Sequence, residues 1–319
     1  MTTTASPTKV AVVGAGNVGA TFAYTLLLSG LAADIVLIDV DRRRAEGEAM
    51  DLSHTVPFAR PTSIEAGDYA DCAGATVTVI AAGSSQRPGE TRLDLVKRNA
   101  GIFGSIVPAV AAANPDGIIV VATNPVDVLT SVSLRLSGLP PGRVFGSGTI
   151  LDTARFRWLL SEHFEVDPRS VHAWIVGEHG DSEVPVWSLA NIAGMRLTDY
   201  CRAHGIPFGD AERDAIFRGT RDAAYEIIDR KGATHYAIAG GLMRIVEAIV
   251  RDQRTVLSVS SHIDDQHGIH GVSLSLPAVI TRAGVERVLR LDLDPGEADG
   301  LRRSAGVLAD ALASLDRPD

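Results

Sequence analysis

Short apolar runs alternate with longer amphipathic stretches through the first half of the chain. The apolar runs lie at 10–13, 35–38, 77–82 and 118–122. The stretches of helical character between them lie at 17–28, 44–52 and 94–113. Apolar runs of this length are typical of parallel strands that are covered on both faces by helices. The alternation therefore predicts an α/β fold with a doubly wound parallel sheet.

The pattern changes after the Pro-Pro-Gly sequence at 140–142, which is the strongest hinge candidate. Beyond it, helices and short strands are mixed, with a strand expected at 171–176 and helices at 234–251 and 296–315. We predict two domains: residues 1–146 hold the doubly wound sheet, and residues 147–319 form an α+β domain that ends in a C-terminal helix.

Charge narrows the classes of partner. The 319 residues include 30 Lys+Arg and 39 Asp+Glu, which gives a net charge of −9. A chain this acidic is a poor match for nucleic acid and for anionic membrane surfaces, so we expect neither as a partner. Only 3 of the basic residues are Lys and 27 are Arg. This excess reflects either a compositional bias of the source genome or the binding of anions, and composition does not decide between them.

The cysteine content and the uncharged segments indicate the cellular compartment in which we expect the protein. Cys72 and Cys201 are too few for a disulfide framework, and no Cys/His ligand spacing occurs, so we expect a reducing cytoplasm and no metal. Residues 1–8 lack the pattern of a signal peptide. Residues 10–33 carry no charge and are long enough to span a bilayer, but glycines and hydroxyl residues interrupt them. We expect a strand, a turn and a helix there.

A glycine motif follows the first strand and opens the first helix. Gly14 permits a tight turn, Gly16 permits close approach of a pyrophosphate, and Gly19 permits packing of the helix on the strand. Asp39 follows Gly19 by 20 residues, at the end of the second strand, where its carboxylate can accept both ribose hydroxyls. The combination predicts a Rossmann-type, dinucleotide-binding sheet. Asp39 could otherwise be a turn or helix-cap carboxylate.

The acidic residue also bears on which dinucleotide binds. Asp39 would repel a ribose phosphate, so NAD is favoured over NADP. Arg42, Arg43 and Arg44 leave the phosphorylated cofactor open as an alternative, although such a run is more often the solvated start of a helix.

Four polar clusters follow strands, at 82–92, 122–127, 146–157 and 177–181. On a helix Asp152 and Arg155 share a face, whereas Arg157 points elsewhere. His179 beside a buried carboxylate would form an acid–base pair. A loop histidine without a catalytic role is the plainer alternative. A metal site built from Glu178, His179 and Asp181 is disfavoured, because adjacent positions do not converge on one ion.

These segments resemble the L-lactate dehydrogenase family, within the lactate and malate dehydrogenases, and specifically its bacterial, fructose-bisphosphate-activated type. The resemblance runs from about residue 9 to the C-terminal helix. Its motifs are GAGNVG at 14–19, MDLSH at 50–54, QRPGETR at 86–92, TNPVD at 123–127, LDTARFR at 151–157 and GEHGDSEVPVWS at 177–188. It implies reversible hydride transfer between NADH and pyruvate, giving (S)-lactate and NAD, in the last step of fermentative glycolysis.

The resemblance assigns catalytic roles to His179, Asp152 and Arg92, and a substrate-binding role to Arg155. His179 donates a proton to the ketone oxygen and takes it back in the reverse direction, and Asp152 holds His179 and raises its pKa. Arg92 polarises the carbonyl group. Arg155 presents a planar fork to the substrate carboxylate, which Lys could not copy. For Arg92 and Arg155 the alternative is a surface salt bridge.

The resemblance also implies two sets of binding residues. The substrate set is Gln86, Arg92, Asn124, Asp152, Arg155 and Thr234. The cofactor set is Gly14, Gly16, Val18, Gly19, Asp39, Arg44, Tyr69, Gly83, Ser84, Ser105, Ala122, Asn124 and Ser147.

Gln86 decides between lactate and malate as the hydroxy acid. Malate dehydrogenases normally have an arginine at this position, and a neutral Gln86 leaves a second carboxylate uncompensated in a closed site. Glu90 adds negative charge to the same loop, whereas Arg87 would serve a dicarboxylate if the loop shifted by one residue. Pyruvate is favoured, and malate dehydrogenase remains the alternative.

Arg157 and His172 match positions of the fructose-bisphosphate site in the bacterial enzymes. The resemblance therefore implies a homotetramer in which facing subunits pair these cations around an activating sugar bisphosphate. The alternatives are an ion-paired surface arginine and a satisfied strand histidine. Two further classes fit less well. An NAD-dependent glycosidase would need a Cys/His metal site, and a silent nucleotide sensor would have lost His179 or Arg155.

Overall fold

The computed structural model describes residues 8–84, 89 and 91–315. Six parallel strands form most of the main sheet: β1 (Lys9–Val13), β2 (Asp34–Ile38), β3 (Ser63–Ala66), β4 (Val77–Ile80), β5 (Ile118–Val121) and β6 (Val144–Gly146). The chain runs outward from β1 to β2 and β3 and then continues from β4 on the other side of β1. The predicted α/β fold with a Rossmann-type sheet is therefore confirmed.

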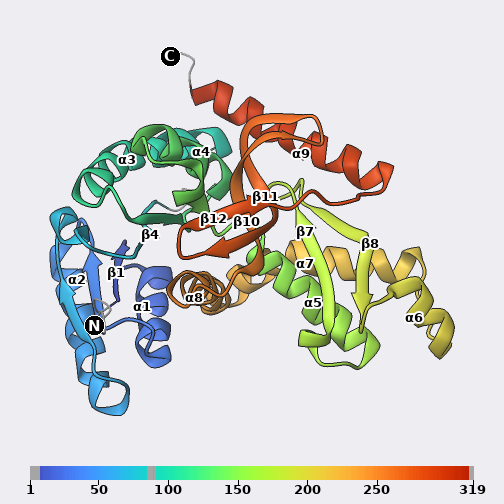
Figure 1. The fold of residues 1–319 in the computed structure, drawn as a ribbon, viewed down its shortest axis with the longest axis horizontal. Coiled ribbons are helices and arrows are strands. Elements are labelled where there is room, and N and C mark those ends of the chain that lie inside the picture. The colour runs from blue at the N-terminus through green and yellow to red at the C-terminus, as the bar shows by residue number, and fades with distance from the viewer. Residues whose placement is uncertain (1–7, 85–88, 90, 316–319) are drawn as a thin grey trace, which may run out of the picture.

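Helices cover both faces of this sheet (Figure 1). Val10 and Val12 of β1 pack toward α1 (Asn17–Ser29), α2 (Arg42–Thr55) and α8 (Tyr236–Val250). Ala11 and Val13 face the opposite way, toward α3 (Arg92–Ala113) and α4 (Val126–Ser137). Side chains alternate between the two faces of a strand, so an uninterrupted apolar run fills a core on each side.

The sequence placed most of these elements but set several boundaries too narrow or too wide. β4 ends at Ile80 and β5 at Val121, earlier than predicted, because the ladder of paired residues stops there. Helix α2 begins at Arg42, where the Asp41 side chain accepts a hydrogen bond from the backbone of Arg44, and it extends to Thr55.

The sheet does not stop at the predicted hinge. Residues Pro141–Arg143 form a short 3₁₀ turn that leads directly into β6. Three antiparallel strands then extend the same sheet, β10 (Thr255–Gln266), β11 (Ile269–Thr281) and β12 (Gly284–Val288), with β10 paired to β6. The prolines thus lie in the connection between α4, which ends at Ser137 with Gly138 as its cap, and β6. The division at 146/147 stays a prediction.

The remaining elements carry the second half of the site. A three-stranded sheet contains β7 (Val171–Val176), β8 (Val184–Ile192) and β9 (Met195–Arg196). It lies with α5 (Ile150–Phe164), α6 (Leu197–His204) and α7 (Asp210–Lys231), while α9 (Pro295–Leu315) lies over β8 and β11 (Figure 1). No helix in the described part of the chain is long and apolar enough to cross a membrane.

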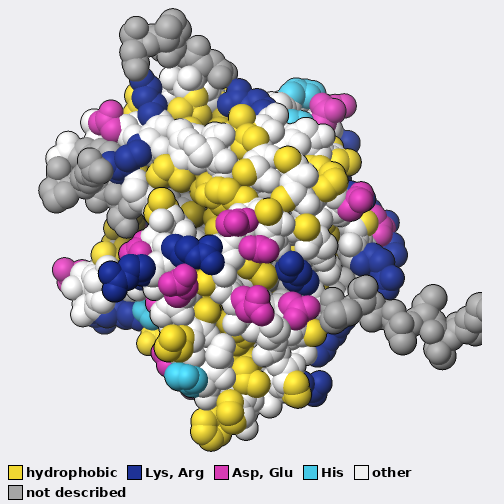
Figure 2. All heavy atoms as spheres, turned by 90° about the vertical axis from the view of Figure 1, so that its left-hand side faces the viewer, with side chains coloured by type: hydrophobic (Ala, Val, Ile, Leu, Met, Phe, Trp, Pro, Cys, Tyr) yellow, Lys and Arg dark blue, Asp and Glu magenta, His cyan; other side chains and the backbone are white. Residues whose placement is uncertain are grey.

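Surface charge is mixed in sign. Figure 2 shows acidic and basic side chains interspersed with hydrophobic ones on one face of the molecule, rather than a field of one sign.

Candidate active site

Asp152, Arg155 and His179 meet between α5 and the loop that follows β7. The Asp152 carboxylate accepts a hydrogen bond from Arg155 Nη1 at 2.9 Å through Oδ1, and its Oδ2 lies 2.5 Å from His179 Nδ1. The side chains of Asp152 and Arg155 are 3% and 13% exposed, and that of His179 is 23% exposed. One buried carboxylate therefore holds both the candidate proton donor and the candidate substrate arginine.

Strand β11 fixes the relative position of these residues. Gly148 has φ +52, and a Cβ there would lie 2.3 Å from Ser275 Oγ, so a glycine lets the start of α5 approach the sheet. Ser275 Oγ accepts a hydrogen bond from the Thr149 backbone, and the Ser275 backbone pairs with Gly177. A single residue of β11 thus anchors the segments that carry Asp152 and His179.

The pair shifts the proton affinity of the histidine. Burial alone would lower the pKa of His179, but the adjacent Asp152 carboxylate more than offsets burial and raises the pKa from 6.5 to about 9. Burial likewise opposes ionisation of Asp152, while His179 and Arg155 lower its pKa. The favoured state at neutral pH is an imidazolium on a carboxylate, which is the state that donates a proton.

Asp127 binds the backbone of the same histidine, and it was not assigned a role from the sequence. This buried residue of α4 accepts the His179 backbone N–H through Oδ2 at 2.7 Å. Burial raises the pKa of Asp127 to about 6. The only sequence signal was its position in the TNPVD segment, where a carboxylate falls among apolar helix residues.

A cavity of about 450 Å³ lies at the carboxyl ends of β1, β2 and β4. A Cβ on Gly16 would meet no atom within 4 Å, so the backbone there faces open space that a pyrophosphate can approach. Gly14, at φ +102, lies so close to β4 that a Cβ would be 2.4 Å from the Ala82 backbone. The residues present therefore fit a dinucleotide.

Most predicted cofactor residues line that cavity. They are Gly14, Gly16, Asp39, Arg44, Tyr69, Gly83, Ser84 and Ser105. Gly19 instead serves packing, because a Cβ there would lie 1.8 Å from the Gly14 carbonyl oxygen. Val18, Ala122, Asn124 and Ser147 do not line it. Asp39 accepts backbone N–H groups from Ala15 and Asp41, at 2.7 and 2.9 Å, so it also braces the glycine loop.

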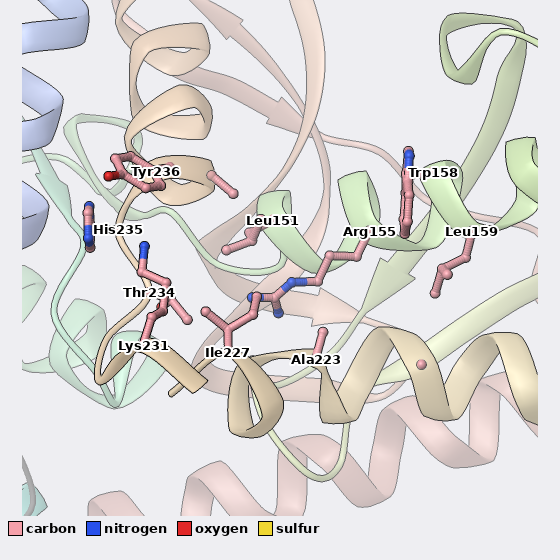
Figure 3. A pocket seen from close by; sticks show the side chains of 12 residues that line it. Leu151, Arg155, Trp158, Leu159, Ala223, Ile227, Lys231, Thr234, His235 and Tyr236 are labelled. Carbon is pink, nitrogen blue, oxygen red and sulfur yellow. The ribbon is translucent and has the colours of Figure 1, made fainter. Parts of the chain in front are cut away.

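The candidate substrate residues Arg155 and Thr234 line one cavity of about 410 Å³ between α5, α7 and the start of α8. In Figure 3, the Arg155 side chain reaches from α5 across this cavity toward Ile227 and the segment that carries Thr234. The surrounding wall is largely apolar and includes Leu151 and Ile227. A carboxylate that entered here would meet one guanidinium in apolar surroundings.

The loop before α3 is only partly described. Gln86, Arg87 and Glu90 lie outside the described residues, and α3 begins at Arg92, whose side chain is likewise not described. Asn99 of α3 joins the segment after β4 to the segment after β5. Its amide accepts the Ser84 N–H at 2.9 Å and donates to the Asn124 carbonyl at 2.9 Å. Asn99 was not identified from the sequence, since an asparagine in a helix gives no specific signal.

Arg157 points away from Arg155, as its helix position predicts. Its Nε donates to the Ala173 carbonyl at 2.9 Å, and its guanidinium stacks over Trp174 at 4.5 Å from the ring centroid. His172 is exposed two residues before Trp174, hence on the same face of β7. The structure thus brings the predicted effector residues to one strand face.

Across the described ranges, no group of three or more His, Cys, Asp or Glu side chains is arranged to hold a metal ion.

Nearly the whole chain matches known proteins of one family. The model of the lactate/malate dehydrogenase NAD binding domain matches residues 8–146, and that of the lactate/malate dehydrogenase alpha/beta C-terminal domain matches residues 149–316. The L-lactate dehydrogenase of Thermoanaerobacter sp. (strain X514) is 51% identical over 308 residues, which cover 97% of this chain and 99% of that protein. The L-lactate dehydrogenase of Priestia megaterium is 52% identical over 300 residues, 94% of each chain.

A solved structure shows the same arrangement. MGS-M5, a lactate dehydrogenase from a deep-sea metagenome library of the Medee basin, superimposes with a TM-score of 0.95 at 43% identity, over 98% of this chain and 99% of that chain.

Proposed function

The chain belongs to the lactate/malate dehydrogenase family and is an NAD-dependent oxidoreductase, and we propose that it is an L-lactate dehydrogenase that interconverts pyruvate and (S)-lactate. The observation that carries the proposal is the cluster in which Asp152 holds both His179 and Arg155. The names of relatives at 51 and 52% identity support it. Malate dehydrogenase, the alternative that the motifs left open, is not favoured by these names.

Arg155 would bind the substrate carboxylate. Its bond to Asp152 uses one of five guanidinium donors, so a fork remains for the two carboxylate oxygens. The side chain is largely buried and Asp152 holds it in place, so little conformational freedom is lost on binding. Thr234 lines the same cavity and can contact the carboxylate from the opposite wall.

His179 would move the proton. NADH, when bound, supplies the hydride that reduces the keto carbon. His179 donates its Nε2 proton to the oxygen of that carbon, while Nδ1 stays bound to Asp152. The carboxylate stabilises the imidazolium before the transfer and fixes the ring orientation after it. In lactate oxidation the neutral imidazole takes the proton back.

Three residues in the segments that follow β4 and β5 complete the proposed site. Arg92 would polarise the carbonyl, and Asn124 would donate to the same oxygen. Gln86 would contact the pyruvate methyl end and disfavour a second carboxylate. Gln86→Arg is expected to move specificity toward oxaloacetate, and an unchanged preference would contradict this assignment.

The direct test is NADH oxidation on addition of pyruvate, followed by absorbance, with the product identified by a chiral assay. The proposal predicts equimolar (S)-lactate, and His179→Gln is expected to abolish turnover while NADH still binds. Formation of the (R) isomer, or no NADH oxidation, would contradict it.

We also propose activation by fructose bisphosphate at Arg157 and His172. In the part of the chain that the structure describes, no carboxylate pairs with the Arg157 guanidinium, and burial lowers its pKa, so a bound phosphate would relieve an uncompensated charge. Arg157, Arg169 and Arg244 line a cavity of about 420 Å³. Fructose bisphosphate is expected to lower the KM for pyruvate, and Arg157→Gln to remove that effect. An unchanged KM in the native enzyme would refute the proposal.

A homotetramer acting in the cytoplasm at the last step of fermentative glycolysis is the setting that we propose. Large hydrophobic side chains are exposed on α1 and α2, among them Tyr24, Leu28 and Met50, and these suit contact with another copy. Cys72 and Cys201 are free and buried, in keeping with a reducing compartment. Light scattering should give four times the 33.6 kDa chain mass, and a smaller mass would contradict the tetramer.

A further inference from the structure

Glu183 is a buried acid beside the site whose role the proposed mechanism leaves unassigned. It directly precedes β8, in the turn after His179, and its backbone N–H donates to the Gly180 carbonyl at 3.1 Å. The residue is 6% exposed. Its Oε1 is buried and, as far as the described chain goes, has no hydrogen-bond partner.

Charged groups from three segments face this carboxyl. Asp152 and Arg155 lie on α5, His179 in the loop after β7, and Arg221 on α7, and each acts electrostatically on Glu183. Arg155 is engaged with Asp152, and Arg221 is engaged with Asp222 at 2.8 Å. The two arginines that act on Glu183 therefore already have carboxylate partners.

Two other buried acids near His179 are accounted for. Glu178 accepts a hydrogen bond from the Ser182 hydroxyl at 2.5 Å, and Asp127 accepts the His179 backbone N–H. Asp127 Oδ1 is also buried without a partner, but the other oxygen of Asp127 has a donor. The Glu183 carboxyl has neither a hydrogen bond nor an ion pair among the described residues, and a buried carboxylate without donors is expensive to ionise. Asp152 is a second source of cost, since a carboxylate that is already ionised repels another one nearby.

We propose that Glu183 is a positioning residue for the anionic substrate: its carboxyl stays protonated beside Arg155 and His179 and so leaves both cations to the substrate. This inference rests on the proposed function. With substrate bound, the charges of Asp152 and the substrate carboxylate balance those of Arg155 and protonated His179. An ionised Glu183 would add an uncompensated negative charge and compete for the same cations.

The consequence is a proton that accompanies binding at alkaline pH. Burial, together with the Asp152 carboxylate, raises the pKa of Glu183 from 4.5 to about 9. Near pH 9 about half of the Glu183 side chains would be ionised in the free site, and each must take up a proton before an anion can bind well. His179 takes up its own proton in the same range, so the two contributions have to be separated by mutation.

The experiment is calorimetric titration of the enzyme–NADH complex with oxamate, the amide isostere of pyruvate, near pH 9 in buffers of different ionisation enthalpy. Wild type is expected to take up more protons per site than Glu183→Gln, by roughly half a proton. Glu297→Gln is the matched control. Glu297 is 7% exposed but is bonded to Ser188 in the middle of β8, and its substitution should leave the uptake unchanged.

Equal uptake by wild type and Glu183→Gln would refute the inference, as would a variant that binds oxamate markedly more tightly at pH 7, because Glu183 would then be ionised there. A second measurement needs no variant. Above about pH 9 the wild-type Kd for oxamate should rise by more than tenfold per pH unit, since two groups must be protonated, and a rise of tenfold or less would overturn the inference. Failure of wild type to bind oxamate would instead refute the proposed function, and the inference with it.

Discussion

Asp152→Asn isolates the carboxylate on which the site depends. The substitution keeps the size of the side chain but removes the charge at 2.5 Å from His179 Nδ1. In the native protein the pKa of His179 is about 9, against an ordinary value of 6.5. The difference corresponds to about 3 kcal/mol in favour of the imidazolium. Without the carboxylate, burial is the largest remaining influence and lowers the pKa, and only the weaker effects of Asp127 and Glu183 oppose it.

The lower pKa of His179 translates into a lower rate of pyruvate reduction. If the pKa returns to the ordinary 6.5, about a tenth of His179 would be protonated near pH 7.5, compared with nearly all of it in the native enzyme. The kcat/KM for pyruvate reduction should therefore fall at least about tenfold from protonation alone. It should fall further because Arg155 also loses its partner. Lowering the pH to about 5.5 should restore part of the loss in the variant, while the native enzyme changes little.

The assay is a pH profile of kcat/KM for pyruvate with both proteins. Asp127→Asn is the matched control, because its side chain meets the backbone of His179 rather than the ring, and an asparagine oxygen still accepts that N–H. It should move the alkaline break less than Asp152→Asn does. If the Asp152→Asn profile breaks at the native pH, Asp152 does not set the proton affinity of His179 and the reasoning is wrong.

Four further substitutions test substrate binding, the stability of the fold and cofactor binding. Arg155→Lys removes the planar fork and should raise the KM for pyruvate roughly 10- to 100-fold with NADH affinity unchanged, and a KM within twofold of native would contradict that role. The pKa of Glu183 is raised from 4.5 to about 9, so its contribution to stability is complete below pH 4.5 and is lost as the pH rises through 9. Chemical denaturation should therefore show Glu183→Gln stabilised by about 2 kcal/mol or more at pH 8 and little changed at pH 5, whereas equal effects at both values would exclude a raised pKa. A Cβ at Gly14 meets the Ala82 backbone, whereas one at Gly16 meets open space, so Gly14→Ala should lower the Tm and Gly16→Ala should weaken NADH binding at unchanged Tm. Equal Tm values for the two variants would contradict the packing argument.

Local patterns predicted the parallel half of the fold well. The continuous apolar runs at β1, β2, β4 and β5 identify strands that are buried on both faces, and the glycines and Asp39 fall where a strand gives way to a turn. The addition of β10, β11 and β12 to the same sheet was missed. The pairing of β10 with β6 joins residues more than a hundred positions apart, and no local pattern records such a contact.

The residues of the site likewise divide into those that local patterns predicted and those that they did not. Helix geometry predicted that Asp152 and Arg155 share a face, and the structure shows them bonded at 2.9 Å. Asp127, Asn99 and Glu183 escaped prediction because their importance lies in what surrounds them: a backbone N–H, two loop segments and a cluster of charges. Arg157 was identified by motif, but its stacking on Trp174 follows only from the packing of α5 on β7.

A competition experiment measures the choice between pyruvate and oxaloacetate. Equal concentrations of pyruvate and oxaloacetate are offered to the enzyme with limiting NADH, and the ratio of lactate to malate in the products gives the ratio of the two kcat/KM values. Lactate is expected in large excess, at least about tenfold, because a second carboxylate in the proposed site lacks a cationic partner. Malate as the main product would contradict it.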